Sequence, residues 1–156
     1  MARYVRQRSR IRMGWVTIVL VTTVWVFLAA GVGGAADAFT HKAAARTHLR
    51  LAVSLGERAL GGLSSAASLP QLGGVMPLVR DMLEHAKQAS GELKNARQFN
   101  APGPLLTMQI DKIESTHGMI RYTLDQTGRP WEEYQGEAMR SMRQAVVTLQ
   151  TALAMM

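Results

Sequence analysis

The sequence predicts an all-α protein: a single N-terminal transmembrane helix followed by an extracytoplasmic up-down four-helix bundle, completed within one chain or with partner chains. Three observations lead to this prediction. Residues 13–36 carry no charge, prolines and glycines divide the rest into four segments, and each segment repeats apolar residues at steps of three and four. Alanine, leucine, methionine and glutamine dominate the body, which favours helix over sheet.

The N-terminal stub, residues 1–13, is strongly basic. Because lysine and arginine concentrate on the cytoplasmic side of spanning helices, we expect the stub in the cytoplasm. The body is then expected on the periplasmic or outer face of a bacterial inner membrane. The arginines are also expected to attract anionic lipid headgroups. Five of the 18 basic residues lie in the stub, with no acid among them: Arg3, Arg6, Arg8, Arg10 and Arg12.

The membrane helix is predicted over residues 14–36. The uncharged stretch has 24 residues, and about 20 apolar residues are enough to cross the hydrocarbon layer. Trp15 stands where an interfacial anchor is expected. The alternative is a cleaved signal peptide with an A-x-A site at Ala36-Asp37-Ala38. The stretch is long for that class and carries two tryptophans, and both alternatives deliver the body to the same side of the membrane.

Three proline and glycine breaks divide the extracytoplasmic domain, residues 37–156, into four helical segments. The apolar stripe of each segment matches the seam of a left-handed bundle. Short loops between the segments favour up-down-up-down topology. The predicted helices span about 38–68, 76–99, 104–127 and 130–156.

The predicted seams are rich in alanine and glycine, which bury little apolar area per residue. Gly56, Gly61 and Gly62 lie in the first segment, and each costs up to about 1 kcal/mol relative to alanine in a helix. We therefore expect a bundle of modest stability that a partner would stabilise.

The distribution of charge argues against nucleic-acid binding. From Asp37 onward the chain holds 13 basic and 11 acidic residues, a net charge of +2, although the whole chain carries +7. A nearly balanced body is not a phosphate-binding surface. The chain has no cysteine, which excludes disulfides, cysteine-based zinc sites and thiol catalysis.

Glu114 and His117 form the one Glu-x-x-His motif of the chain. Di-iron bundles use two such motifs and two further glutamates. Here the second motif is missing, and Glu84 and His85 are its nearest substitutes. We therefore expect His117 to be a core or interface histidine, and no metal or other cofactor. No Gly-x-Ser-x-Gly motif or phosphate loop is present, so we expect no enzyme.

Four residues are candidates for contact with a partner. Trp131 and Tyr134 open the last segment. Trp131 is expected to close the end of the bundle, with an aromatic partner contact as the alternative. Met119 and Met139 lie off the main seams, where methionine serves either as satellite core or as an adaptable binding surface.

The expected function is that of a non-catalytic, membrane-anchored interaction protein. It would be a small structural or assembly subunit of an envelope complex for secretion, conjugation or energy conversion. Its expected partners are membrane lipid, other subunits or further copies of the chain. The layout also resembles the input half of chemoreceptor-type sensors, which implies a ligand-binding module, but a second membrane helix and a signalling part are missing. A weaker resemblance is to phage inner-membrane spanins, whose long charged coiled coils lack the proline and glycine breaks.

Overall fold

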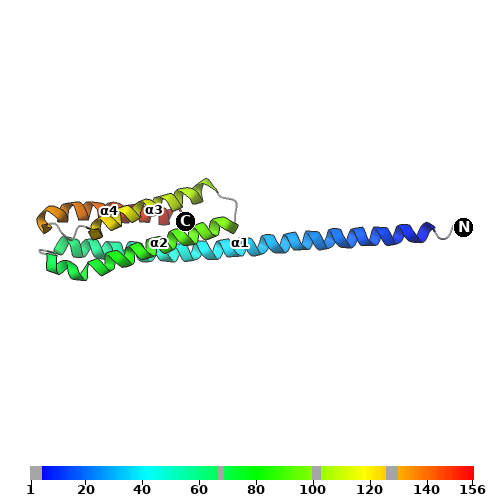
Figure 1. Ribbon diagram of the computed structural model, residues 1–156, viewed down its shortest axis with the longest axis horizontal. Helices are drawn as coiled ribbons and strands as arrows, with labels where there is room; N and C mark the ends of the chain where they lie inside the picture. Colours follow the sequence, from blue (N-terminus) through cyan, green and yellow to red (C-terminus); the bar gives the residue numbers. More distant parts are fainter. Residues whose placement is uncertain (1–4, 67–68, 100–102, 126–129) are drawn as a thin grey trace. The chain divides into compact units, whose positions relative to one another are not determined.

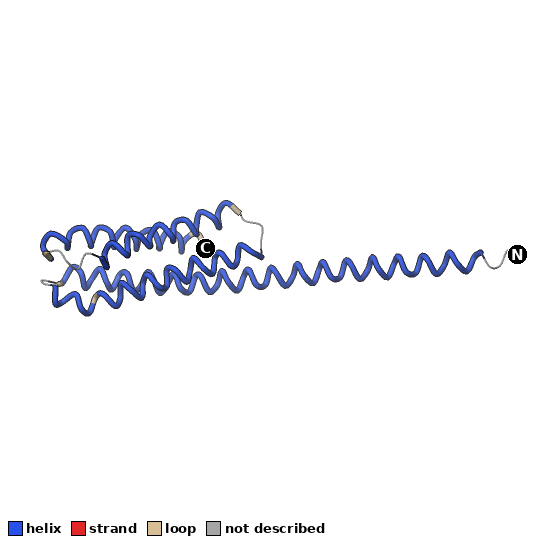
Figure 2. The backbone as a smooth tube through the Cα atoms, in the orientation of Figure 1, coloured by secondary structure: helices blue, strands red, loops and turns tan. Residues whose placement is uncertain are grey.

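The computed structural model confirms the predicted all-α class. The described residues form four α-helices and one short 3-10 helix, with no strand among them (Figure 2). These elements are α1 (Val5–Ser65), η1 (Leu69–Gly74), α2 (Met76–Phe99), α3 (Pro104–Asp125) and α4 (Trp131–Ala154). The structure describes the backbone of residues 5–66, 69–99, 103–125 and 130–156, and side chains within 34–66, 71–99, 103–125, 130 and 132–156.

The chain divides into two compact units, Met1–Asp37 and Ala38–Met156, and α1 contributes to both. In the first unit the backbone is helical from Val5. The basic stub, Trp15 and residues 14–33 of the predicted membrane helix lie outside the residues whose side chains are described. Within the described part of the chain, no helix combines the length and the apolar character that crossing a membrane requires. The membrane helix stays a prediction.

The second unit is a bundle in which helices that follow one another in the sequence lie side by side (Figure 1). His41 of α1 lies 2.6 Å from Glu92 of α2. Seven residues further along α1, His48 lies 3.1 Å from His85, which is seven residues earlier in α2. The two helices are therefore antiparallel. An ion pair between Lys94 and Glu114 joins α2 to α3.

Helix α4 closes the bundle between α3 and α1. The Ser141 hydroxyl donates to the Met119 carbonyl of α3 over 2.9 Å. On the other side, Gln150 Nε2 donates to Glu57 Oε1 of α1 over 3.0 Å. Each helix thus meets the next, and the last meets the first. The four helices of one chain enclose the core.

A seven-residue repeat of alanine lines the core side of α1. This spacing keeps one face toward the neighbouring helices when they supercoil, and the small side chains let the helices approach closely. The apolar stripe predicted for α2 is also buried along its full length. The buried alanines of this repeat are Ala38, Ala45, Ala52 and Ala59 of α1 and Ala66 directly after its end.

At Gly56, α1 closely approaches two other helices. A Cβ added there would lie 2.5 Å from Val146 Cγ2 of α4 and 2.9 Å from Met82 Cε of α2. The residue is buried, so α1 touches both neighbours where it has no side chain. At Gly61 an added Cβ would meet nothing within 4 Å. The two glycines of one helix therefore have opposite roles in packing.

Side chains of neighbouring helices cap the last turns of α1 and α3. The final carbonyls of an α-helix have no partner within the helix. Gln135 Nε2 of α4 donates to the Leu63 carbonyl over 3.0 Å and to the Ala66 carbonyl over 3.4 Å. The buried Tyr134 hydroxyl donates to the Thr123 carbonyl. Two adjacent residues of α4 thus fix the ends of two other helices.

Candidate functional site

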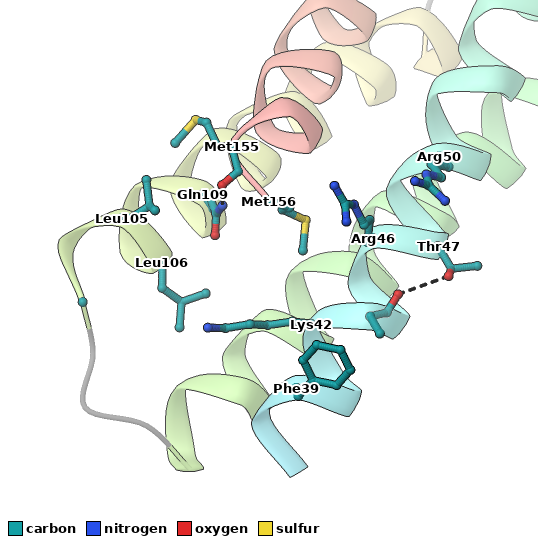
Figure 3. A pocket seen from close by; sticks show the side chains of 12 residues that line it. Phe39, Lys42, Arg46, Thr47, Arg50, Leu105, Leu106, Gln109, Met155 and Met156 are labelled. Atoms are coloured by element: carbon teal, nitrogen blue, oxygen red, sulfur yellow. Dashed lines mark hydrogen bonds between the residues drawn. The ribbon is translucent and has the colours of Figure 1, made fainter. Parts of the chain in front are cut away.

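A groove of about 880 Å³ opens where α4 ends (Figure 3). Val146 of α4 packs at Gly56 of α1, and α4 ends at Ala154. Because the helices are antiparallel and rise by about 1.5 Å per residue, α1 extends about three turns past the end of α4, to Ala38. The groove is the space that a longer α4 would fill.

One wall of the groove is cationic. Lys42, Arg46 and Arg50 follow one another at four-residue spacing on α1 and are exposed. This spacing places them on one helix face over about 12 Å. No acidic side chain is among the described residues that line the groove. The ion pairs found in the described part of the chain involve other cations.

The opposite wall is apolar. Leu105 and Leu106 of α3 form it together with Met155 and Met156 after α4. In Figure 3 the Lys42 side chain reaches across toward Leu106. Buried Gln109 holds the end of α4 in place, because its Nε2 donates to the Met155 carbonyl over 2.7 Å. A cationic wall and an apolar wall thus face the same space.

Three large apolar side chains are exposed at this end of the bundle. Phe39 and Leu105 line the groove and are 74% and 53% exposed. Phe99, 43% exposed, stacks on His41 with ring centroids 5.7 Å apart. We call Phe39, Phe99 and Leu105 the end cluster. It lies at the end of the bundle where Ala38 begins the unit.

The residues considered for a metal site do not converge. Glu114 is paired with Lys94, Glu84 Oε1 accepts from Gln88 Nε2 over 3.4 Å, and His85 contacts His48. Among the described residues, no group of three or more histidine, aspartate or glutamate side chains could hold a metal ion. Glu114, His117, Glu84 and His85 therefore do not form such a group in the described part of the chain.

His117 lies half-buried between α3 and α2. Burial lowers its pKa below the ordinary value of 6.5, while a hydrogen bond to the Ala86 backbone and the charge of Glu114 act in the opposite direction. Its Nε2 atom is buried without a hydrogen-bond partner among the described residues. The neutral ring is therefore favoured in the folded state.

The partner-contact candidates lie in different environments. Tyr134 is fully buried, and burial raises its pKa to about 12. Its capping of α3 places it in the core rather than on a surface. Met119 and Met139 are partly buried and pack against the core. The side chain of Trp131 lies outside the described residues.

The sequence reasoning missed the groove. The four-residue spacing of Lys42, Arg46 and Arg50 can be read from the sequence and indicates a row of cations on one helix face. The apolar wall cannot be read from it, because it depends on where α3 begins and α4 ends in space. No family model matches this chain, and comparisons with curated proteins and with solved structures find no match.

Proposed function

We propose that this protein is a non-catalytic, membrane-anchored interaction module, a small subunit or assembly factor of a larger bacterial envelope complex. Residues 14–36 anchor it in the inner membrane, residues 1–13 stay in the cytoplasm, and the bundle lies on the periplasmic or outer side. The uncharged stretch of 24 residues and the five arginines before it support this anchor.

The end cluster is the observation that carries the interaction role. Phe39, Phe99 and Leu105 are large apolar side chains, exposed at one end of an otherwise closed bundle. Large exposed apolar side chains gathered in one region of a surface mark contact sites on proteins. The chain enters the bundle at this end, two residues after the predicted membrane helix. The cluster is thus suited to contact with the membrane surface or with a membrane-embedded partner.

A ligand-binding module is the second candidate, and the groove is the observation that favours it. The volume of about 880 Å³ falls within the range of about 300–1,000 Å³ that is typical of small-ligand pockets. In this case the protein would pass a ligand signal to another chain rather than build a complex.

The interaction role is tested by purifying the tagged full chain from native membranes in a mild detergent, followed by sizing and mass spectrometry. We expect other subunits to co-elute in a fixed ratio. Phe99→Ser should loosen the complex, because it removes apolar surface from the end cluster. Val147→Ser is the matched control, since Val147 is 54% exposed but lies on α4 outside the cluster.

Two other outcomes would change the conclusion. Elution of the wild-type chain alone as a monomer would contradict the interaction role. Elution as a small homo-oligomer without other subunits would favour the ligand-binding module. Equal loss of partners in Phe99→Ser and Val147→Ser would remove the end cluster as the contact surface.

A further inference from the structure

The geometry points to a lipid site: the groove between α1, α3 and the end of α4 binds one anionic phospholipid. The phosphate lies on the row formed by Lys42, Arg46 and Arg50, and an acyl chain lies along the opposite apolar wall. This inference deepens the proposed function and rests on it, because membrane attachment brings the groove to a lipid surface.

The cationic wall of the groove is complementary in charge to a phosphate group. Three cations at four-residue spacing share one face of α1, and none of the described groove residues is acidic. Guanidinium groups match the oxygens of a phosphate with several N–H donors, and lysine adds a point charge. An anion entering the groove therefore meets donors from successive turns of one helix and no opposing carboxylate.

The apolar wall of the groove suits an acyl chain. Leu105, Leu106, Met155 and Met156 face the cations from α3 and the end of α4. An inorganic phosphate would leave this wall exposed to water, whereas an acyl chain would cover it. Methionine suits this task, because its flexible thioether adapts to chains of irregular shape. The two walls together match a molecule with one anionic and one apolar part.

The surroundings of the groove favour a membrane lipid over a protein segment. An acidic amphipathic helix would also suit a row of cations. The exposed side chains of Phe39 and Leu105, however, line the groove at the end of the bundle where Ala38 begins the unit. That is the end where the chain arrives from the predicted membrane helix. A lipid at the membrane surface reaches this position directly.

Methionine methyl groups give the test a local readout. The full chain, labelled with ¹³C at the methionine methyls and held in dodecyl maltoside micelles, is titrated with dihexanoyl phosphatidylglycerol. We expect saturable shifts at Met155 and Met156, which line the groove. The fully buried Met82 and Met142 should not respond. Dihexanoyl phosphatidylcholine, with the same chains and no net charge, should give no saturable response.

Charge variants separate the groove from general attraction to a basic surface. Each cation near a lipid surface contributes enough to change affinity about fivefold, so Lys42→Gln with Arg46→Gln should weaken binding about 25-fold. The matched control is Arg80→Gln with Arg143→Gln, which removes two exposed cations from α2 and α4 outside the groove. The control should bind within about twofold of the wild type.

Apolar variants test the acyl wall in the same way. Leu105→Ser should weaken binding of the short-chain lipid several-fold, because Leu105 lines the groove. Met108→Ser should not, although Met108 is also exposed on α3. Both positions are on the surface, so neither change is expected to unfold the bundle.

Four outcomes would overturn the lipid site, and a fifth would overturn only the membrane anchor. Equal shifts with glycerol 3-phosphate would show that the groove binds the phosphate alone. A response to an acidic amphipathic peptide but not to the lipid would assign the groove to a protein partner. Absence of any saturable shift, or equal weakening in both charge variants, would leave no lipid site. A chain that lipid shifts but that fails to insert into membranes would overturn the anchor and not the groove.

Discussion

At the scale of single residues, the structure is organised by polar side chains that satisfy helix ends. Tyr134 and Gln135 of α4 cap the last turns of α3 and α1. Gln109 of α3 does the same at the end of α4. Sequence reasoning assigned Tyr134 to partner contact, because its place in a first turn says nothing about burial. Its partner Thr123 lies on α3, and the sequence does not reveal how the end of α3 meets the start of α4.

Replacing Tyr134 by phenylalanine should destabilise the bundle by about 1–3 kcal/mol, because the Thr123 carbonyl would lose its donor inside the core. Urea unfolding followed by circular dichroism measures this difference. Tyr122→Phe is the control: the Tyr122 hydroxyl donates to Glu137 at the surface, and its loss should cost less than about 1 kcal/mol. Equal costs for the two variants would argue against the buried cap.

His117 should make the bundle less stable in mild acid. Its folded-state pKa lies below the ordinary 6.5, so the unfolded chain takes up the proton first. The stability contributed by the neutral ring is complete above about pH 6.5 and is lost as pH falls through 6.5 toward the folded-state pKa. The wild type should therefore lose up to about 1.4 kcal/mol per pH unit more than His117→Gln in that window.

The measurement is the free energy of unfolding of both proteins from pH 7.5 to 5 on a urea series. The other histidines are present in both proteins, so their contributions cancel in the difference between the two curves. If the free energy of unfolding changed with pH equally in the wild type and in His117→Gln, burial would not lower the pKa of His117 as described.

At the scale of helices, lengths and close approaches decide the fold and the groove. The apolar periodicity and the proline and glycine breaks were enough to predict four helices, and the second stripe is buried as predicted. The same patterns could not show that α4 ends about three turns short of the start of the bundle. That offset depends on how α1 and α4 align at Gly56 and Val146. The groove is a consequence of this alignment.

The two glycines of α1 should respond oppositely to alanine. Gly61→Ala should stabilise the bundle by about 0.5–1 kcal/mol, because the added methyl is in open space and the helix gains propensity. Gly56→Ala should destabilise it by about 1 kcal/mol or more, because the methyl would overlap Val146 and Met82. Thermal unfolding of the two variants compares them. A stabilising Gly56→Ala would show that the helices are not in close contact there.

At the scale of the whole molecule, the distribution of charge matters more than its sum. The body carries a net charge of +2, which predicted no nucleic-acid partner for it. Between residues 38 and 56, however, the chain has three basic residues and no acidic one. The fold places these three on one wall of the groove. The net charge of the whole body conceals this local row, because all of its acidic residues lie outside residues 38–56.

We propose that a retained N-terminal helix holds the bundle on the far side of a bacterial inner membrane. The chain has no cysteine, so single cysteines can report on each side. Ser9→Cys marks the stub and Ser54→Cys marks an exposed position of the bundle. Each variant is treated with a membrane-impermeant maleimide in spheroplasts, before and after permeabilisation, and the mass of the membrane-bound chain is measured.

We expect Ser54→Cys to be labelled in intact spheroplasts and Ser9→Cys to be labelled only after permeabilisation. The chain in the membrane fraction should keep its full-length mass. Labelling of Ser54→Cys only after permeabilisation would place the bundle in the cytoplasm and contradict the account. A shortened, soluble chain would show that the N-terminal segment is a cleaved signal peptide.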